Sequence, residues 1–567
     1  MKPSVIYNDT NSMPWLKRSD YILIIFLLVP LTFLTLFVFS SVDNNRITGW
    51  KWVFASVDPA MISFLLIVGL IIAYGLSRVK FPERYTSFIL FGLSFIIGAI
   101  FWRESELIPD SSRYFTQAKH LELYGVGFFF QEWGKGINAW TDLPLVPFLY
   151  GLIFKFLGES RIYIQIFTTM LFSATVVLTY LIGKTLWDKN VGFFAGLMLM
   201  SMPYLLTQVP LMLVDIPTMF FLTLSVFTFI NALEQGGTKM ILIASIALFL
   251  AFFSKYSSWL MLSVLGIIFL VYLKEGRPKI INRAGAIGLV ASLLIGLVVL
   301  FKFAVISGQI QLLLSYQGSG LRRWQESFIS TFLFQIHPFI TILALYSFYV
   351  AVKKRDLKYG IISWLILLII LGQIERARYT IPVFPMLALM AAYGLNRIKD
   401  IVFKRFTVYG IVSYSVVIAI FAYLPFVQKI STVNLKNAGE YLNSIEEENI
   451  DVFTLPDKES MINPAVFVPM LDIFTQKQIC FQPDNSFSPP QEKINTSSLR
   501  FTWEYKNPQY YMPKGNSTTV VVISNALEEI LPGHIKQKIE GYHLSRVFKT
   551  HEGIFRSKIF VRVYRAV

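Results

Sequence analysis

Residues 21–42 read YILIIFLLVPLTFLTLFVFSSV, an apolar stretch without a charged side chain. A helix needs about 20 apolar residues to cross the hydrocarbon core of a bilayer, so this stretch is long enough to span it. Runs of the same kind recur at Tyr85–Trp102, Tyr163–Gly183, Ala286–Ile306 and Thr407–Val427. The sequence therefore predicts a polytopic α-helical membrane protein.

The composition supports this class. Of the 567 residues, 54% are hydrophobic and only 15% are charged, whereas a soluble protein carries about 25% charged residues. The polar segment Met1–Asp20 runs into the first apolar stretch, which is too long for the core of a secretory signal and is followed by no small-residue cleavage site. We therefore expect the first span to stay in the cell membrane as an anchor.

The apolar runs predict about 13 transmembrane helices. They lie at residues 21–42, 58–77, 85–102, 160–183, 190–208, 215–233, 239–254, 257–274, 286–306, 328–352, 359–373, 379–395 and 407–427. With the N-terminus in the cytoplasm, Lys and Arg concentrate in the inner connections, as the positive-inside rule requires. This distribution explains most of the net charge of +16, so we exclude nucleic acid as a partner.

The chain divides into three regions. Residues 1–84 form an N-terminal cytoplasmic segment with two extra transmembrane helices, and residues 85–427 form a transmembrane core. The core includes the outer loop 103–160, whose stretch Pro144–Leu157 is too short to span and suits an interfacial helix. Residues 428–567 turn polar and predict a soluble α/β domain on the outer, extracytoplasmic face. Its predicted elements are a helix at Lys436–Glu447 and strands at Asp451–Leu455, Thr519–Ser524 and Ile559–Arg565.

Ionisable residues at the outer ends of spans are the candidates for a functional site, because burying charge near lipid is costly. They are Asp110, Asp215, Lys255, Arg376 and Arg378. A carboxylate can accept the proton of an attacking hydroxyl, and Lys or Arg can neutralise a departing phosphate. Structural roles compete with this interpretation. Asp215 precedes Ile-Pro and suits the first turn of a helix, whereas the three cations suit snorkelling to the interface.

Motifs for other chemistries are absent from the sequence. The single cysteine, Cys480, excludes an internal disulfide and disfavours a cysteine-built metal site. We find no phosphate-binding Gly-rich loop and no His-Glu-x-x-His motif. No cofactor is implied, and a divalent cation, Mg²⁺ or Mn²⁺, stays an open alternative. His337-Pro338 lies inside a predicted span and suits a structural role.

Six short elements, in order, carry a resemblance that runs from about residue 85 to 427. They are Asp110…Arg113-Tyr114, Leu143-Pro144-Leu145…Phe156-Leu157-Gly158-Glu159-Ser160, Leu181-Ile182-Gly183-Lys184…Trp187, Asp215-Ile216-Pro217, Ser254-Lys255, and Arg378-Tyr379…Pro382…Pro385. The chain resembles the C-type membrane glycosyltransferases, in the branch that holds the protein O-mannosyltransferases and the lipid A aminoarabinose transferases. It departs from the family pattern at Ser111, where Glu usually follows the Asp, and at Asp142, where a cation or His usually precedes the Pro element.

The resemblance implies roles for these residues. Asp110 would be the catalytic base, with Asp215 as a second catalytic carboxylate, and Lys255, Arg376 and Arg378 would bind the donor phosphate. Apart from the resemblance, Arg113, Tyr114, His120 and Asp142 are further candidates on the outer loop. Arg113 is a neighbouring cation that would keep Asp110 ionised, and His120 is an alternative base.

We therefore predict a membrane glycosyltransferase that moves a sugar from a polyprenyl- or dolichyl-phosphate carrier to an acceptor on the outer face. Direct displacement would invert the anomeric carbon, and protein, lipid and glycan all remain open as acceptor. Two alternatives stay open. An oligosaccharyltransferase-like enzyme normally carries a Trp-Trp-Asp signature, which is missing after residue 428. A transporter or flippase of polyprenyl-linked lipid would place its ionisable residues near the membrane midplane. The sequence predicts no oligomeric state.

Overall fold

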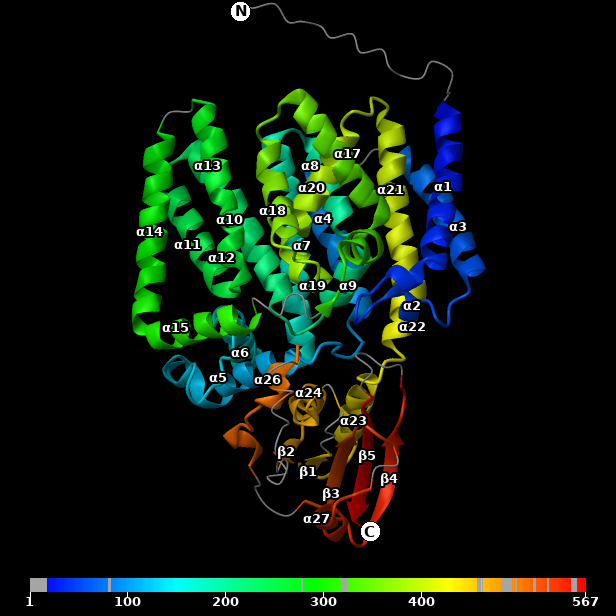
Figure 1. The fold of residues 1–567 in the computed structure, drawn as a ribbon, viewed down its shortest axis with the longest axis vertical. Coiled ribbons are helices and arrows are strands. Elements are labelled where there is room, and N and C mark those ends of the chain that lie inside the picture. Colours follow the sequence, from blue (N-terminus) through cyan, green and yellow to red (C-terminus); the bar gives the residue numbers. More distant parts are fainter. Residues whose placement is uncertain are drawn as a thin grey trace, which may run out of the picture.

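The computed structural model describes residues 18–79, 83–276, 279–317, 324–455, 460, 462–481, 492, 494, 497–512, 517–527, 530–551 and 558–566. These residues form a broad layer of helices with a smaller domain of strands and helices attached to one side (Figure 1). Helix α1 begins on the side of the layer away from this domain, and the C-terminal strand lies within it.

Eight helices in the described part of the chain are long and apolar enough to cross a membrane. They comprise α1 (Arg18–Val38), α3 (Pro59–Ser77), α4 (Thr86–Gly98), α7 (Arg161–Leu186), α10 (Asp215–Gln235), the pair α12 (Ser257–Met261) and α13 (Val264–Lys274), α14 (Ile280–Phe301), and α21 (Ile401–Ile418) continued by α22 (Leu424–Val427). Each overlaps one of the predicted spans. An α-helical membrane protein is thus confirmed.

The other five predicted spans correspond to shorter or interrupted helices that run beside the long ones (Figure 1). They comprise α8 (Lys189–Leu199) with α9 (Pro203–Gln208), α11 (Thr238–Ser254), α17 (Pro338–Lys354), α18 (Tyr359–Leu371), and α19 (Ala377–Thr380) with α20 (Phe384–Leu395). His337 causes one of the interruptions. It caps α17, with its Nδ1 accepting the N–H of Phe339 at 3.1 Å, in agreement with a structural role. The count of 13 spans stays a prediction.

One predicted span has the wrong boundaries. The apolar run at 286–306 does not form one helix, because α14 ends at Phe301 and α15 (Phe303–Leu312) lies across the end of the layer (Figure 1). Two polar side chains account for the turn. Lys302 donates to the carbonyl of Gln131 at 3.1 Å, and Gln309 donates to the carbonyl of Asp142 at 3.0 Å. Hydropathy alone could not locate this bend.

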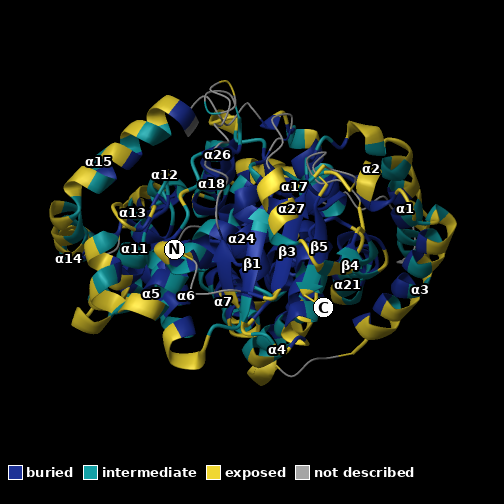
Figure 2. Ribbon diagram, turned by 90° about the horizontal axis from the view of Figure 1, so that it is seen from below, coloured by how far each residue is buried: buried dark blue, intermediate teal, exposed yellow. Residues whose placement is uncertain are grey.

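The outermost helices expose their apolar side chains. Only 11% of the apolar window in α1, and likewise in α14, is buried, and both helices show exposed faces at the periphery of the layer (Figure 2). Along α14 the exposed leucines recur every three or four residues, at Leu289, Leu293, Leu297 and Leu300. Such a stripe is costly in water and favourable against lipid tails. These faces therefore suit contact with the bilayer.

The outer loop 103–160 folds into two helices under the layer, α5 (Ser111–Glu132) and α6 (Leu145–Leu157). Helix α6 coincides with the predicted interfacial helix. Tyr150, in its second turn, fixes it to the start of α10, because the Tyr150 hydroxyl donates to the carbonyl of Leu213 at 2.6 Å. Helix α5 packs along α6 and has Asp110 at its N-terminal boundary. The two helices place the outer-loop residues against the ends of α10 and α11.

The C-terminal region is an α/β domain, as predicted. Its sheet has the order β2-β1-β3-β5-β4, in which β1 (Asn449–Thr454) pairs in parallel with β2 (Gln478–Phe481) and β3 (Thr519–Ser524). Strand β5 (Phe560–Ala566) runs antiparallel to β3 and to β4 (Tyr542–Phe548). The helices of the domain are α23 (Val433–Asn443), α24 (Phe467–Asp472), α26 (Arg500–Trp503) and α27 (Gly533–Lys538). Three of the strands match the predicted runs, whereas β2 and β4 were not predicted. The outer-face location of the domain stays a prediction.

Candidate active site

Six charged side chains form one continuous series of ion pairs, which we call the ion-pair chain. Lys255 Nζ lies 2.6 Å from Asp215 Oδ1, and Arg378 Nε lies 2.8 Å from Asp215 Oδ2. The same guanidinium reaches Asp110 Oδ2 at 2.6 Å through Nη1. Arg113 Nη2 then links Asp110 Oδ1 at 2.9 Å with Asp142 Oδ1 at 3.1 Å. Residues up to 268 positions apart in the sequence thus meet at one place.

Helix ends bring these residues together. Asp110 directly precedes α5, Asp215 is the first residue of α10, Lys255 directly follows α11, and Arg378 lies in α19. All four positions were predicted to lie at the outer ends of spans. Asp215 does occupy a first turn, but its side chain caps no backbone N–H; both of its oxygens bind cations instead.

The two outer-loop carboxylates differ in basicity. Burial raises the pKa of Asp110, but the ion pairs with Arg378 and Arg113 outweigh burial and hold that pKa well below its usual range. Burial also raises the pKa of Asp142, and there the pairing with Arg113 does not fully compensate, so the pKa stays above its usual range. The predicted effect of Arg113, an ionised Asp110, agrees with this geometry.

The ion-pair chain borders a cavity of about 350 Å³. The charged residues that line it are Asp110, Arg113, Asp142, Lys255 and Arg378, together with the tyrosines Tyr114, Tyr256 and Tyr379. Apolar side chains also line it, among them Leu260, Met261, Leu313, Leu365, Leu368 and Ile369. Asp215 does not line the cavity, and 1% of its side chain is exposed. The cavity therefore offers both cations and hydrocarbon to a ligand.

Arg376 is held apart from this cavity. Its Nε lies 3.8 Å from Glu326 Oε1, and its guanidinium carbon lies 3.3 Å from the centre of the Trp324 ring. It is not among the residues that line the cavity. The structure thus brings Lys255 and Arg378 into the lining of one cavity and leaves Arg376 outside it.

Glu326 connects this region to the N-terminal helices. Its Oε2 accepts the N–H of Ala377 at 3.2 Å and lies 3.5 Å from Asn45 Nδ2. Nearby, Asp43 accepts from Ser330 at 2.5 Å and from Gln335 at 2.7 Å. The segment between α1 and α3 therefore contacts the residues that precede Arg378. Neither Glu326 nor Asp43 belongs to a sequence motif. They are found only in the structure, as buried carboxylates that contact residues far away in the sequence.

His120 lies away from the ion-pair chain. Its Nδ1 faces the carbonyl of Thr116 at 2.7 Å, and its ring packs edge-on against Tyr510 of the C-terminal domain, with centroids 5.1 Å apart. Burial lowers its pKa. The ring does not line the cavity beside Asp110, so the geometry favours a packing role over a second base.

Sequence reasoning missed two amides that support the site. Gln117 donates to Asp142 Oδ2 at 3.1 Å. Gln309 accepts from Tyr256 at 2.6 Å while it donates to the backbone at Asp142. In the described residues no three His, Cys, Asp or Glu side chains are grouped as metal ligands. A role for Mg²⁺ or Mn²⁺ stays a prediction.

Comparisons with known proteins concern the family and the fold of the chain. Residues 142–303 match the family described as dolichyl-phosphate-mannose-protein mannosyltransferase, whereas no curated protein matches in sequence. ArnT from Cupriavidus metallidurans, bound to undecaprenyl phosphate, is 11% identical with a TM-score of 0.52, and the alignment covers 84% of this chain and 97% of that one. The apo state of the same protein gives 0.51 at the same identity and coverage.

A more distant structure is the oligosaccharyltransferase AglB from Archaeoglobus fulgidus, at 12% identity and a TM-score of 0.49, covering 78% of this chain and 70% of that one. Similarity at this level does not establish a shared fold. The family match and the fold shared with ArnT confirm that this chain resembles the C-type membrane glycosyltransferases, in the branch of the protein O-mannosyltransferases and the lipid A aminoarabinose transferases.

Proposed function

We propose that the chain transfers a sugar from a polyprenyl- or dolichyl-phosphate carrier to an acceptor hydroxyl. One observation carries the proposal: a single cavity is lined both by paired cations and carboxylates and by aliphatic side chains. A lipid-linked phosphate has the matching parts, an anionic head group and a hydrocarbon tail. The family match at residues 142–303 and the fold shared with ArnT support the reaction class.

Lys255 and Arg378 are the cations that bind the phosphate. Both line the cavity, and both are oriented by Asp215, whose two oxygens hold one cation each. As the sugar leaves, negative charge grows on the phosphate oxygen, and positioned cations stabilise it most in the transition state. Asp215 is therefore a positioning residue in this proposal.

Asp110 is the general base. Each of its oxygens accepts one hydrogen bond from an arginine, and a carboxylate oxygen has two lone pairs, so each can also accept from a hydroxyl. The acceptor O–H proton moves to Asp110, a bond forms between the acceptor oxygen and the anomeric carbon, and the bond to the phosphate oxygen breaks with its electrons. One displacement of this kind inverts the anomeric carbon.

The test uses purified chain in nanodiscs with a polyprenyl phosphate that carries a radiolabelled sugar. We expect release of the free lipid phosphate together with transfer of label to an acceptor or to water. A transporter would instead move the intact donor across sealed proteoliposomes without cleaving it. Translocation of uncleaved donor, with no lipid phosphate released, would refute the proposal.

A further inference from the structure

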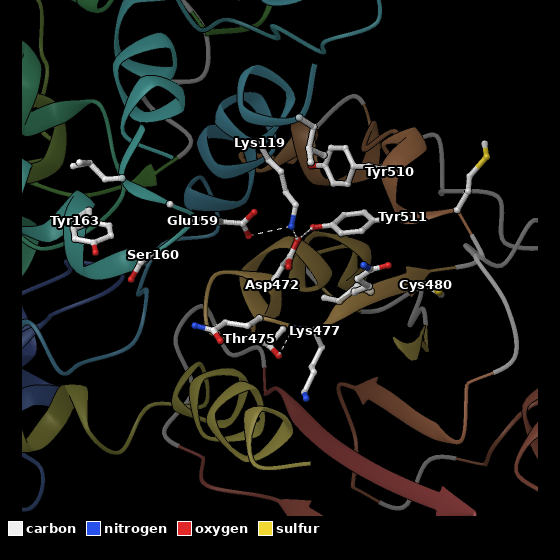
Figure 3. A pocket seen from close by; sticks show the side chains of 17 residues that line it. Lys119, Glu159, Ser160, Tyr163, Asp472, Thr475, Lys477, Cys480, Tyr510 and Tyr511 are labelled. Carbon is white, nitrogen blue, oxygen red and sulfur yellow. Dashed lines mark hydrogen bonds and ion pairs between the residues drawn. The ribbon is translucent and has the colours of Figure 1, made fainter. Parts of the chain in front are cut away.

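A second and larger cavity lies between the outer loop and the C-terminal domain (Figure 3). Its volume is about 620 Å³, within the usual range of small-molecule sites. One side comes from α5 and from the turn between α6 and α7, through Lys119, Glu159 and Tyr163. The other side comes from the domain, through residues 475–480 and 510–512. No residue of the ion-pair chain lines it.

Four polar side chains that line this cavity form a cluster joined by ion pairs and a hydrogen bond. Lys119 Nζ lies 2.7 Å from Asp472 Oδ2 and 3.0 Å from Glu159 Oε1, and the Tyr511 hydroxyl donates to Asp472 at 2.7 Å. Figure 3 shows these four side chains pointing toward one another. The side chain of Asp472 is 1% exposed. Because this cluster joins α5 to α24, it fixes the outer loop and the domain on either side of the cavity.

The rest of the lining has both apolar side chains, among them Leu123, Leu157, Ile479 and Met512, and polar ones that are mostly uncharged. Hydroxyl and amide groups come from Ser160, Thr475, Gln476 and Gln478. The lining has two cations, Lys119 and Lys477, against the carboxylates Glu159 and Asp472, and Lys477 donates to the carbonyl of Ile445. A strongly charged ligand gains little from such a balance. The chemistry suits a ligand with many neutral hydroxyls.

Two tyrosine rings in the lining also suit a sugar ligand. Tyr163 and Tyr510 line the cavity, and Lys119 Nζ lies 5.6 Å from the centre of the Tyr510 ring. A sugar ring presents C–H bonds on its faces and hydroxyls around its edge, so it can pack on a tyrosine while carboxylates and amides accept and donate at the edge. A lipid tail would leave these polar groups unpaired.

An adjoining cavity of about 400 Å³ shares Glu159, Ser160, Thr475 and Gln476 with it. The adjoining cavity also has the charged side chains Arg103, Arg161, Lys436 and Glu440 in its lining, so a neutral ligand suits only the larger cavity, which we call the groove. Lys119 lies nine positions after Asp110 on α5, which at 1.5 Å per residue is about 13 Å along the helix. The groove is therefore too far from the base to hold the reacting hydroxyl.

We propose that this groove binds a neutral oligosaccharide portion of the acceptor, remote from the hydroxyl that receives the sugar. The inference rests on the proposed function, of which it names the acceptor class. Binding energy from such a remote portion can position the reacting end at Asp110.

The experiment places full-length protein in nanodiscs on an array of neutral, acidic and amino-sugar oligosaccharides, with a peptide array beside it. We expect binding to neutral oligosaccharides. Gln476→Ala and Gln478→Ala change exposed side chains of the lining, and each should weaken binding about threefold to tenfold, the effect of one neutral hydrogen bond. Ser160→Trp should abolish binding by filling the groove. Gln537→Ala, on exposed α27, is the matched control and should change nothing.

Binding only to peptides, only to acidic glycans or to neither array would overturn the inference, as would glycan binding unaffected by Ser160→Trp. Array binding needs no donor, whereas cleavage of the donor needs no glycan. Glycan binding without donor cleavage would therefore contradict the proposed function and leave the groove assigned. Donor cleavage without glycan binding would support the proposed function and contradict the inference about the groove.

Discussion

Arg378 Nη1 lies 2.6 Å from Asp110 Oδ2, so a cation proposed to bind the leaving phosphate is already paired with the proposed base. The same guanidinium contacts Asp215 at 2.8 Å. One side chain thus couples the two halves of the proposed reaction, because phosphate bound near Arg378 changes the field at Asp110. Buried charges that share a partner interact strongly, and substitutions among them are not expected to be additive.

Asp110→Asn tests the general base. The amide keeps the size of the side chain but cannot accept the proton, so we expect transfer to fall by about 10²–10⁴-fold. Binding of the lipid-linked donor should change little. The measurement is single-turnover transfer alongside donor affinity, with Asp142→Asn as the comparison. Near-normal turnover of Asp110→Asn with a large loss in Asp142→Asn would move the role to Asp142.

Arg378→Ala removes a cation that neutralises two carboxylates at once. Breaking a buried ion pair by removing one partner costs about 3–5 kcal/mol, so we expect both a lower melting temperature in detergent and weaker donor binding. Arg378→Lys keeps the charge but cannot reach both carboxylates with a planar fork, so it should recover part of the stability and little of the turnover. Full activity in the Lys variant would contradict this two-carboxylate role.

Substitutions of Lys255 and Arg376 should have different effects, although the sequence predicted that both residues bind the donor phosphate. Lys255 lines the cavity, whereas Arg376 pairs with Glu326 and does not line it. We expect Lys255→Ala to weaken donor binding by about 1.5–3 kcal/mol, as for a charge-assisted contact, and Arg376→Ala mainly to lower the melting temperature. The measurement is equilibrium binding of a polyprenyl phosphate to the two variants. Equal losses of affinity would assign Arg376 to the phosphate site together with Lys255.

The pH dependence of transfer distinguishes the two outer-loop carboxylates. A base must be ionised to act, and the pKa of Asp110 is held below its usual range by Arg378 and Arg113. If Asp110 is the base, kcat/KM should stay level as the pH falls from 7 to 5. Burial holds the pKa of Asp142 above its usual range, so a base at Asp142 would lose activity at a higher pH. A decline that begins near neutral pH would contradict the assignment to Asp110.

The orientation of the C-terminal domain is open to a labelling test. Cys480 is the only cysteine and is 4% exposed within β2, so the native thiol should not react. In a Cys480→Ser background, Gln537→Cys places one thiol on exposed α27. We expect a membrane-impermeant reagent to label right-side-out vesicles and to leave sealed inverted vesicles unlabelled. The opposite pattern would place the domain in the cytoplasm.

Local sequence patterns were sufficient to predict most helices and three of the strands. They were not sufficient to predict which distant residues contact one another. Apolar length located the helices, and a continuous run of β-branched residues located β3 with its observed bounds. The rule that charge at a span end is costly found Asp110, Asp215, Lys255 and Arg378. What it could not provide was pairing across the chain: Arg376 pairs with Glu326, a residue 50 positions before it that belongs to no motif, whereas Arg378 pairs with Asp110 and Asp215. The bend at Lys302 was missed for a similar reason, since its partner is the distant carbonyl of Gln131.

Cations and carboxylates alternate along the ion-pair chain in equal number: Lys255, Arg378 and Arg113 against Asp215, Asp110 and Asp142. An electroneutral resting site offers an incoming phosphate no net attraction. The phosphate gains a cation only as far as a carboxylate gives one up or takes a proton, so the acidic side chains compete with it for the same guanidinium and ammonium groups. In the proposed reaction, that competition would favour return of the free lipid phosphate to the bilayer once the sugar has left.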